Sequence, residues 1–452
     1  MLTSATALQA APVGQSERIG LLDALRGFAI LGILLMNIPG FGLPSGVGFD
    51  PSLWNEFGSA NFSLWYYVNL IPEGTQRAIF SMLFGAGIIL FSTRAEKKLD
   101  GSLPADYFLR RQLWLMVFGL IDVWIFLWFG DILFDYACLG IVMFAFRRLP
   151  GKHLLIGAAI CLLLMMGRET RDLYKDKAMI ATGEAIAAID TTKTKLTEQQ
   201  KEQLSAMTDF RDRSSKAKKL KRTEKSIRKT TGSYGDAYEY RGDLYMGFMV
   251  RFVYLGAWDV LAFMFLGMAL FKMNILTGQG PMKQYWIMTI AGLTIGLGLS
   301  WLRVQNFIKY DFNAFNIAKN ETFDLYTLSR TARSVGLLGL LMLMYRSGWF
   351  SRLFNLMKPV GQMAFTNYLT QSILCGLIFY GVGFGLYGKL QRIEVYYVVL
   401  GIWVLQIVWS HLWLRYFNFG PFEWLWRSLT YWKWQPLRKQ EKGSLAAASV
   451  SA

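Results

Sequence analysis

Charged residues, cysteines and histidines are scarce in this sequence. Charged side chains account for 17% of the 452 residues, whereas a soluble domain averages about 25%. The three cysteines, Cys138, Cys161 and Cys375, fall inside apolar runs and form no C-x-x-C pair. A disulfide framework and a zinc site are therefore not expected, and no other metal site is predicted. The sequence also lacks a glycine-rich nucleotide-binding motif, G-x-S-x-G and H-E-x-x-H, so it carries no signature of the enzyme classes that use them.

Apolar residues are abundant instead. Hydrophobic residues make up 53% of the chain and aromatic residues 15%, with 16 tryptophans, several of them beside the charged ends of apolar runs, as in an interfacial aromatic belt. This composition predicts an all-α, polytopic transmembrane protein. The formal net charge of +17 lies largely in short loops between apolar runs, where it indicates topology and contact with anionic membrane lipids. Nucleic acid is not a predicted partner.

About ten apolar segments can cross a bilayer, which needs about 20 residues per helix. The predicted spans are Leu21–Ile38, Thr75–Phe91, Leu113–Phe129, Ile132–Phe146, Leu154–Met166, Tyr245–Phe271, Tyr285–Leu302, Leu325–Tyr345, Gly361–Phe384 and Val395–Leu414. The aromatic segment Asn61–Ile71 is too short to cross alone and is predicted to be interfacial or re-entrant. Loops rich in Lys and Arg alternate with loops that lack them, so the positive-inside rule places both termini in the cytoplasm.

Residues 168–243 break the alternation of apolar spans and short loops. This stretch is polar and carries a basic run at 216–229. Long translocated segments are largely exempt from the charge rule, so the stretch is predicted to be a mostly helical, periplasmic insert. The basic run is interpreted as a solvated helix face, with binding of an anionic lipid or polymer as the alternative. The insert divides the chain into an N-terminal bundle at 1–167, a C-terminal region at 244–440 and a disordered tail at 441–452.

Charged residues inside the spans are candidates for function, because burying an unpaired charge in lipid is costly. Asp23 and Arg26 are three residues apart, so they share one helix face and can form a pair. Asn37 lies near the other end of the same span and needs a polar partner there. Asp122 and Asp259 are flanked by apolar residues and are the predicted catalytic carboxylates, able to relay protons, coordinate a cation or act as a general base.

Further polar residues are predicted to bind substrate. Asp131 and Asp135 lie at the turn into the fourth span, where capping of that helix is the alternative role. Guanidinium groups suit phosphate or carboxylate capture, although Arg330 and Arg333 could instead neutralise Asp259 or Asp122. The remaining substrate-binding candidates are Arg77, near the start of the second span, and Asn367 and Gln371, in a polar stripe that either joins helices or lines a permeation path.

Five segments, taken in order, resemble a known family. They are ERIGLLDALRGFAILGILLMNI near the start, FSMLFGAGIIL at 80–90, WFGDILFDYACLG at 128–140, PVGQMAFTNYLTQS at 359–372 and FGPFEWLWRSLTYWKWQPLR at 419–438. These five motif segments resemble the YeiB-like family of bacterial inner-membrane proteins, whose C-terminal half is named domain of unknown function 418. The resemblance implies a location in the bacterial cytoplasmic membrane.

The same family is distantly similar to transmembrane acyltransferases. That similarity implies an acyl-coenzyme A donor, with the opening LDALRG as the part of the pattern kept here, including Asp23, Arg26 and Gly27. Those relatives rely on a histidine, but where many of them read F-G-L-L-H this chain reads FGLID, with Asp122. The only histidines are His153 and His411, and neither matches a family position.

Three functions remain open from the sequence. The first is an acyltransferase-like protein that handles an acyl group or an acylated envelope substrate, with Arg26 at the donor and Asp122 or Asp259 as the base. The second is a transporter or channel for a small solute or cation that uses the intramembrane carboxylates. The third is a membrane scaffold without turnover. Membrane lipids and an acyl thioester or small solute are the expected partners, and a homo-oligomer remains open.

Overall fold

The computed structural model describes residues 19–98, 102–190, 192–193 and 195–439, and helices account for nearly all of the regular structure in these ranges. The predicted tail at 441–452 lies outside them. The helices are α1 Gly20–Gly42, η2 Pro51–Trp54, α2 Ala60–Leu70, α3 Thr75–Lys98, α4 Leu103–Trp124, α5 Leu133–Phe144, α6 Gly151–Ala187, α7 Glu198–Ser214, α8 Lys216–Thr230, α9 Tyr234–Arg251, η3 Phe252–Gly256, α10 Ala257–Lys272, α11 Met282–Lys309, α12 Ala314–Asn320, α13 Tyr326–Ser347, α14 Ser351–Gln362, α15 Ala364–Phe379, α16 Arg392–Tyr416 and α17 Pro421–Tyr431.

The described helices confirm a polytopic, all-α membrane protein. Six of them, counting joined helices as one, are long and apolar enough to cross a membrane. They are Gly20–Gly42, Ala60–Lys97, Gly151–Ala187, Tyr234–Lys272, Met282–Lys309 and Arg392–Tyr416. Leu133–Phe144 and Ala364–Phe379 are shorter apolar helices. Every predicted span falls on one to three of the helices of the structure, with Tyr245–Phe271 covering parts of α9 and α10 and the whole of η3.

The third predicted span differs from the structure at its end. It was predicted to reach Phe129, but α4 ends at Trp124 and residues 125–132 are not helical. Leu127 has a φ of 60° and Asp131 is buried. Irregular backbone at membrane depth is tolerated where it is buried in protein. The segment 125–132 is therefore a buried break between α4 and α5, which places Asp131 inside the bundle.

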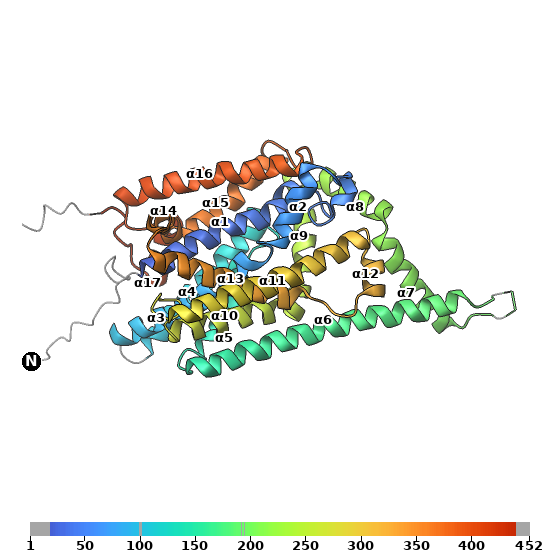
Figure 1. Cartoon of the computed structure of the whole chain (residues 1–452). Coiled ribbons are helices and arrows are strands. Elements are labelled where there is room, and N and C mark those ends of the chain that lie inside the picture. Colours follow the sequence, from blue (N-terminus) through green and yellow to red (C-terminus); the bar gives the residue numbers. More distant parts are fainter. Residues whose placement is uncertain (1–18, 99–101, 191, 194, 440–452) are drawn as a thin grey trace, which may run out of the picture.

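The basic loops gather at one end of the bundle (Figure 1). Four contacts between loops that are far apart in sequence show this: Arg147 with Glu96, Lys272 with the Leu149 carbonyl, Arg346 with the Gly278 carbonyl, and Lys358 against Gly20. We call this the α17 end, because α17 lies there too (Figure 1). The opposite end, where α7 and α8 lie, is called the insert end.

The insert is helical, as predicted, but it is continuous with the bundle. Helix α6 runs through position 168 without a break, and α8 packs on the loops of the insert end. Lys219 pairs with Asp50 at 2.8 Å and donates to the Phe312 carbonyl, while Thr223 donates to the Ser45 carbonyl. The basic run thus buries one small polar face and leaves most of its lysines and arginines exposed, which agrees with a solvated face.

Helices α1 and α14 touch backbone to backbone. A Cβ atom added to Gly361 would lie 1.7 Å from the Asp23 carbonyl oxygen, and one added to Gly27 would lie 2.3 Å from the Met357 carbonyl oxygen. Only glycine permits this approach, since small residues let helix backbones come close in membranes. The contact joins the LDALRG segment to the PVGQ segment, although more than three hundred residues separate them.

We expect Gly361→Ala to separate α1 from α14 and to lower the melting temperature measured in detergent. Overpacking of this kind typically costs about 1–3 kcal/mol. Gly401→Ala is the matched control, because Gly401 also lies in a helix and no other atom lies within 4 Å of its added Cβ. Equal melting temperatures for the two variants would contradict the close contact.

Candidate functional site

A cavity of about 240 Å³ lies between α1, α3, α4, α5, α14, α15 and α17. Its lining residues are Ile19, Leu22, Asp23, Arg26, Phe80, Leu83, Phe84, Gly87, Ile88, Leu90, Phe91, Arg94, Phe108, Arg111, Gln112, Leu115, Leu133, Tyr136, Gly361, Gln362, Ala364, Phe365, Tyr368, Glu423, Trp426 and Arg427. Each of the five motif segments contributes to this wall, and the other residues come from the end of α3 and from α4. The segments that carry the family resemblance therefore meet at one place.

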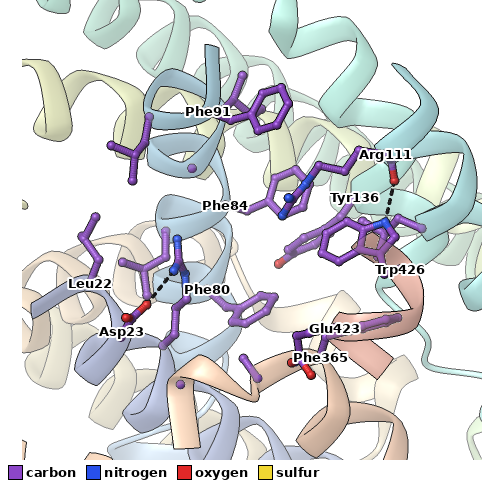
Figure 2. A pocket seen from close by; sticks show the side chains of 18 of the residues that line it. Leu22, Asp23, Phe80, Phe84, Phe91, Arg111, Tyr136, Phe365, Glu423 and Trp426 are labelled. Atoms are coloured by element: carbon purple, nitrogen blue, oxygen red, sulfur yellow. Dashed lines mark hydrogen bonds and ion pairs between the residues drawn. The ribbon is translucent and has the colours of Figure 1, made fainter. Parts of the chain in front are cut away.

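The walls of the cavity are mostly apolar and aromatic, with charges set into them. Figure 2 shows Asp23 on one side and Arg111, Trp426 and Glu423 on the other, with the rings of Phe80 and Phe84 between them in this view. The charged lining residues are four arginines and two acidic residues, namely Arg26, Arg94, Arg111, Arg427, Asp23 and Glu423. Positive charge is thus in excess in a mostly apolar chamber.

Asp23 and Arg26 form the predicted pair. The Arg26 Nη1 atom donates to Asp23 Oδ1 at 3.0 Å, and the Arg26 side chain keeps 29% of its surface exposed. The packing of α1 on α14 positions this pair at the cavity wall. Because Arg26 is only partly covered, part of its guanidinium remains available to a ligand.

Arg111 lies on the opposite wall, and its neighbours there are aromatic rings. Its guanidinium carbon is 3.9 Å from the centre of the Trp426 ring and 5.6 Å from that of Phe91. The Trp426 indole N–H donates to the Arg111 carbonyl at 2.9 Å, which fixes α17 against α4. Stacking on aromatic faces holds a guanidinium while leaving its N–H edge open.

Glu423 binds the start of α15. Its Oε1 accepts from the Phe365 and Thr366 amides at 2.8 and 3.0 Å, and its Oε2 accepts from the Thr366 hydroxyl. A carboxylate complements the positive end of a helix and satisfies amides that the helix leaves unpaired. Glu423 is thus a structural cap at the cavity wall.

The inner wall of the cavity contacts the buried carboxyl groups. Tyr368 lines the cavity, and its hydroxyl lies 3.3 Å from Asp131 Oδ1. Asp131 also caps α5, accepting from the Phe134 amide at 3.0 Å. The carboxyl group of Asp122, which is 0% exposed, lies near that of Asp131. Two of the predicted site residues therefore lie together, one hydroxyl away from the cavity.

Asp259 belongs to a different cluster. It accepts from Arg77 at 2.8 Å and also pairs with Arg330, which is 0% exposed. Neither Asp259 nor these arginines line the cavity. A carboxylate held by two guanidinium groups is a poor general base, so this arrangement favours the ion-pairing alternative for Asp259. Asp135 is buried near Asp131 and Arg77 and links the two clusters electrostatically.

Arg333 caps another helix. Its Nη1 atom donates to the carbonyls of Asn69, Leu70 and Ile71, at the end of α2. Those carbonyls have no partner inside the helix, so the side chain stabilises the helix end. Its predicted role in binding substrate stays a prediction, and no contact of Arg333 with the cavity is present.

The amide candidates lie between helices. Asn367 donates to Ser410 at 3.1 Å and accepts from the Trp409 indole at 2.7 Å, which joins α15 to α16. Gln371 donates to the Ile30 carbonyl and to Gln406 at 3.2 and 3.0 Å. These bonds favour the helix-joining role over a permeation path. Asn37 is half-buried and lies outside the cavity lining.

Several cavity residues were not predicted from the sequence. Arg94, Arg111 and Tyr368 gave no signal: the two arginines stand in a basic loop region, and Tyr368 stands next to the stronger polar candidate Asn367. Neither His153 nor His411 lines the cavity, which agrees with their loop and span-end positions in the sequence.

The fold and this cavity define a polytopic α-helical membrane protein with a charged, aromatic chamber inside its bundle. The chain belongs to the YeiB-like family: the family described as "Protein of unknown function (DUF418)" matches residues 270–433. This chain is 30% identical to the YxaH protein of Bacillus subtilis (strain 168), and the alignment covers 95% of this chain and 98% of that protein. It is also 28% identical to the YeiB protein of Escherichia coli (strain K12), over 92% of this chain and 96% of that protein. No solved structure matches the chain.

We expect Asp259→Asn to destabilise the protein strongly, because Arg330 would keep a buried charge without its counter-charge. Breaking a buried pair in this way costs about 3–5 kcal/mol. Thermal unfolding in detergent measures the effect. Asp243→Asn is the control, since Asp243 is exposed on α9 and surface changes usually stay within about 0.5 kcal/mol. A stability for Asp259→Asn equal to that of the control would rule out the structural role.

Proposed function

We propose that this protein is an acyltransferase-like enzyme whose cavity binds the anionic and thioester part of an acyl donor. The observation that carries the proposal is the meeting of all five motif segments at one cavity with an excess of arginines. The distant similarity of the family to transmembrane acyltransferases suggests the reaction class. That similarity is an analogy, and the chemistry of the cavity supports it independently.

The charge and shape of the cavity suit an anionic amphiphile. Arg26 and Arg111 both line the cavity, and Asp23, the partner of Arg26, lies across from Arg111 in Figure 2. Guanidinium groups there can capture phosphate or carboxylate with two N–H groups each. The aromatic walls suit an acyl chain or a pantetheine arm. Whole drug-sized ligands occupy pockets of about 300–1,000 Å³, so a cavity of about 240 Å³ accommodates only the reactive part of a coenzyme A thioester.

The proposal includes a sidedness. The basic loops of the α17 end would face the cytoplasm, where acyl-coenzyme A is made, and the insert would face the periplasm, in accordance with the positive-inside rule. Arg26 and Arg94 lie near helix termini at the α17 end. The donor would then enter from the cytoplasm, and the acceptor would come from the envelope side. The location in the bacterial cytoplasmic membrane is part of the same proposal.

A second candidate function is transport of a small solute or cation. The observation that favours it is the buried carboxyl pair of Asp122 and Asp131, since intramembrane carboxyl groups commonly mark proton or ion pathways. Among the described residues no group of acidic, histidine and cysteine side chains has the geometry of a metal site. The excess of arginines at the cavity gives acyl transfer the stronger support.

We expect purified protein to bind acyl-coenzyme A saturably, and Arg111→Gln to weaken that binding about 10-fold or more. A hydrogen bond to a charged group contributes about 1.5–3 kcal/mol, and this substitution removes the charge of the guanidinium. Isothermal calorimetry or scintillation proximity measures the affinity, and Arg26→Ala is tested in parallel.

Arg110→Gln is the matched control, because Arg110 is the exposed neighbour of Arg111 on the same helix and does not line the cavity. Binding should be unchanged in that variant. No saturable binding by well-folded wild-type protein, or equal loss in both variants, would contradict the proposed function and favour flux assays.

A further inference from the structure

Tyr368 connects the cavity to the carboxyl pair of Asp131 and Asp122. Tyr368 is buried, lines the cavity and accepts a hydrogen bond from the Ile132 amide at 3.2 Å. Because a phenol hydroxyl has one proton and its oxygen already accepts from this amide, the proton is directed at Asp131 Oδ1, 3.3 Å away. The Tyr368 hydroxyl can give its proton to Asp131 only if its oxygen takes another proton from a group in the cavity.

The carboxyl pair can accept one more proton. Asp122 and Asp131 are buried neighbours: a Cβ atom added to Gly119, one helical turn before Asp122 on α4, would lie 2.7 Å from Asp131 Oδ2. Two carboxyl groups that share a buried site do not both ionise, because like charges repel, so one of them holds a proton and the other can accept one. The Ser372 hydroxyl donates to Asp122 Oδ2 at 3.2 Å. The buried Asp122 Oδ1 receives no bond from an amide, N–H or hydroxyl group among the described residues. The other charged groups near the pair are Asp135 and, beyond it, Arg77.

We infer that Tyr368, Asp131 and Asp122 form a proton-accepting relay at the inner end of the cavity, which serves in place of the missing histidine as the general base toward the acceptor hydroxyl. This inference rests on the proposed acyl transfer. It replaces Asp259, which two arginines neutralise. It also assigns a catalytic role to Tyr368, which the sequence did not predict.

The step balances in atoms and charge. The oxygen of the acceptor hydroxyl attacks the thioester carbonyl, so a C–O bond forms and the C–S bond breaks. The acceptor's proton passes to the Tyr368 oxygen while the Tyr368 proton passes to Asp131, which leaves both carboxyl groups of the pair protonated. The departing thiolate takes a proton from water at the α17 end. General base catalysis of this kind contributes about 10²–10⁴-fold to a rate.

The test compares Tyr368→Phe with Tyr285→Phe. Tyr285 is equally buried, and its hydroxyl also accepts from one amide, that of Gly280, and donates to one oxygen, that of Ile275, far from the cavity. Octanoyl-coenzyme A is the probe, with glycerol or water as acceptor, and thiol release gives the rate. We expect Tyr368→Phe to lose about 10²-fold or more in rate with an unchanged affinity for the probe, whereas Tyr285→Phe keeps both.

Infrared spectroscopy tests the shared proton without turnover. We expect a carboxylic acid C=O band that shifts in Tyr368→Phe and is lost or shifted in Asp122→Asn and Asp131→Asn, but is unchanged in Tyr285→Phe. A wild-type rate in Tyr368→Phe, or a band insensitive to all three variants, would overturn the relay. If the probe does not bind but the band behaves as expected, the acyl transfer fails while the proton-accepting relay stands, as a proton-coupled transporter would need.

Discussion

The contact between the backbones of α1 and α14 is the constraint on which the cavity depends. At Gly27 and Gly361 no side chain separates the two helices, so the start of α1 lies directly against the junction of α14 and α15. That junction turns Phe365 toward α17, where Glu423 caps α15. The Asp23 and Arg26 pair, the aromatic wall of α3 and the Arg111 wall of α4 are arranged around this contact. A bundle with α1 one side chain further away would lose the shared wall.

The low dielectric constant of a membrane explains why the charged residues divide into separate groups. An unpaired charge in lipid is costly, so Asp259 is neutralised by Arg77 and Arg330 and the Arg333 guanidinium lies on the carbonyls that end α2. These residues hold helices together. The arginines of the cavity differ, because aromatic rings rather than carboxylates surround Arg111. The proposed binding of an anionic ligand rests on this aromatic setting of Arg111 and on the number of arginines in the cavity wall.

Much of the fold follows from the sequence, because a spanning helix must satisfy its own backbone and bury apolar residues, and both demands leave a local pattern. The helical insert and the Asp23–Arg26 pair are local features of this kind, and both are present. The break at 125–132 escaped prediction because its residues are as apolar as a span. The cavity escaped it because periodicity within one segment says nothing about which segments meet. Glu423, Tyr368 and Arg111 each depend on a partner more than fifty residues away.

Photolabelling tests the central claim most directly, namely that the five motif segments enclose the binding site of an acyl donor. An acyl-coenzyme A analogue with a diazirine in its acyl chain would be irradiated with the purified protein, and the labelled peptides would be mapped by mass spectrometry. The account predicts saturable labelling within Phe80–Phe91 and Phe365–Tyr368, competed by unlabelled acyl-coenzyme A. Labelling confined to the exposed outer faces of α11 and α16, or labelling that excess competitor does not reduce, would contradict it.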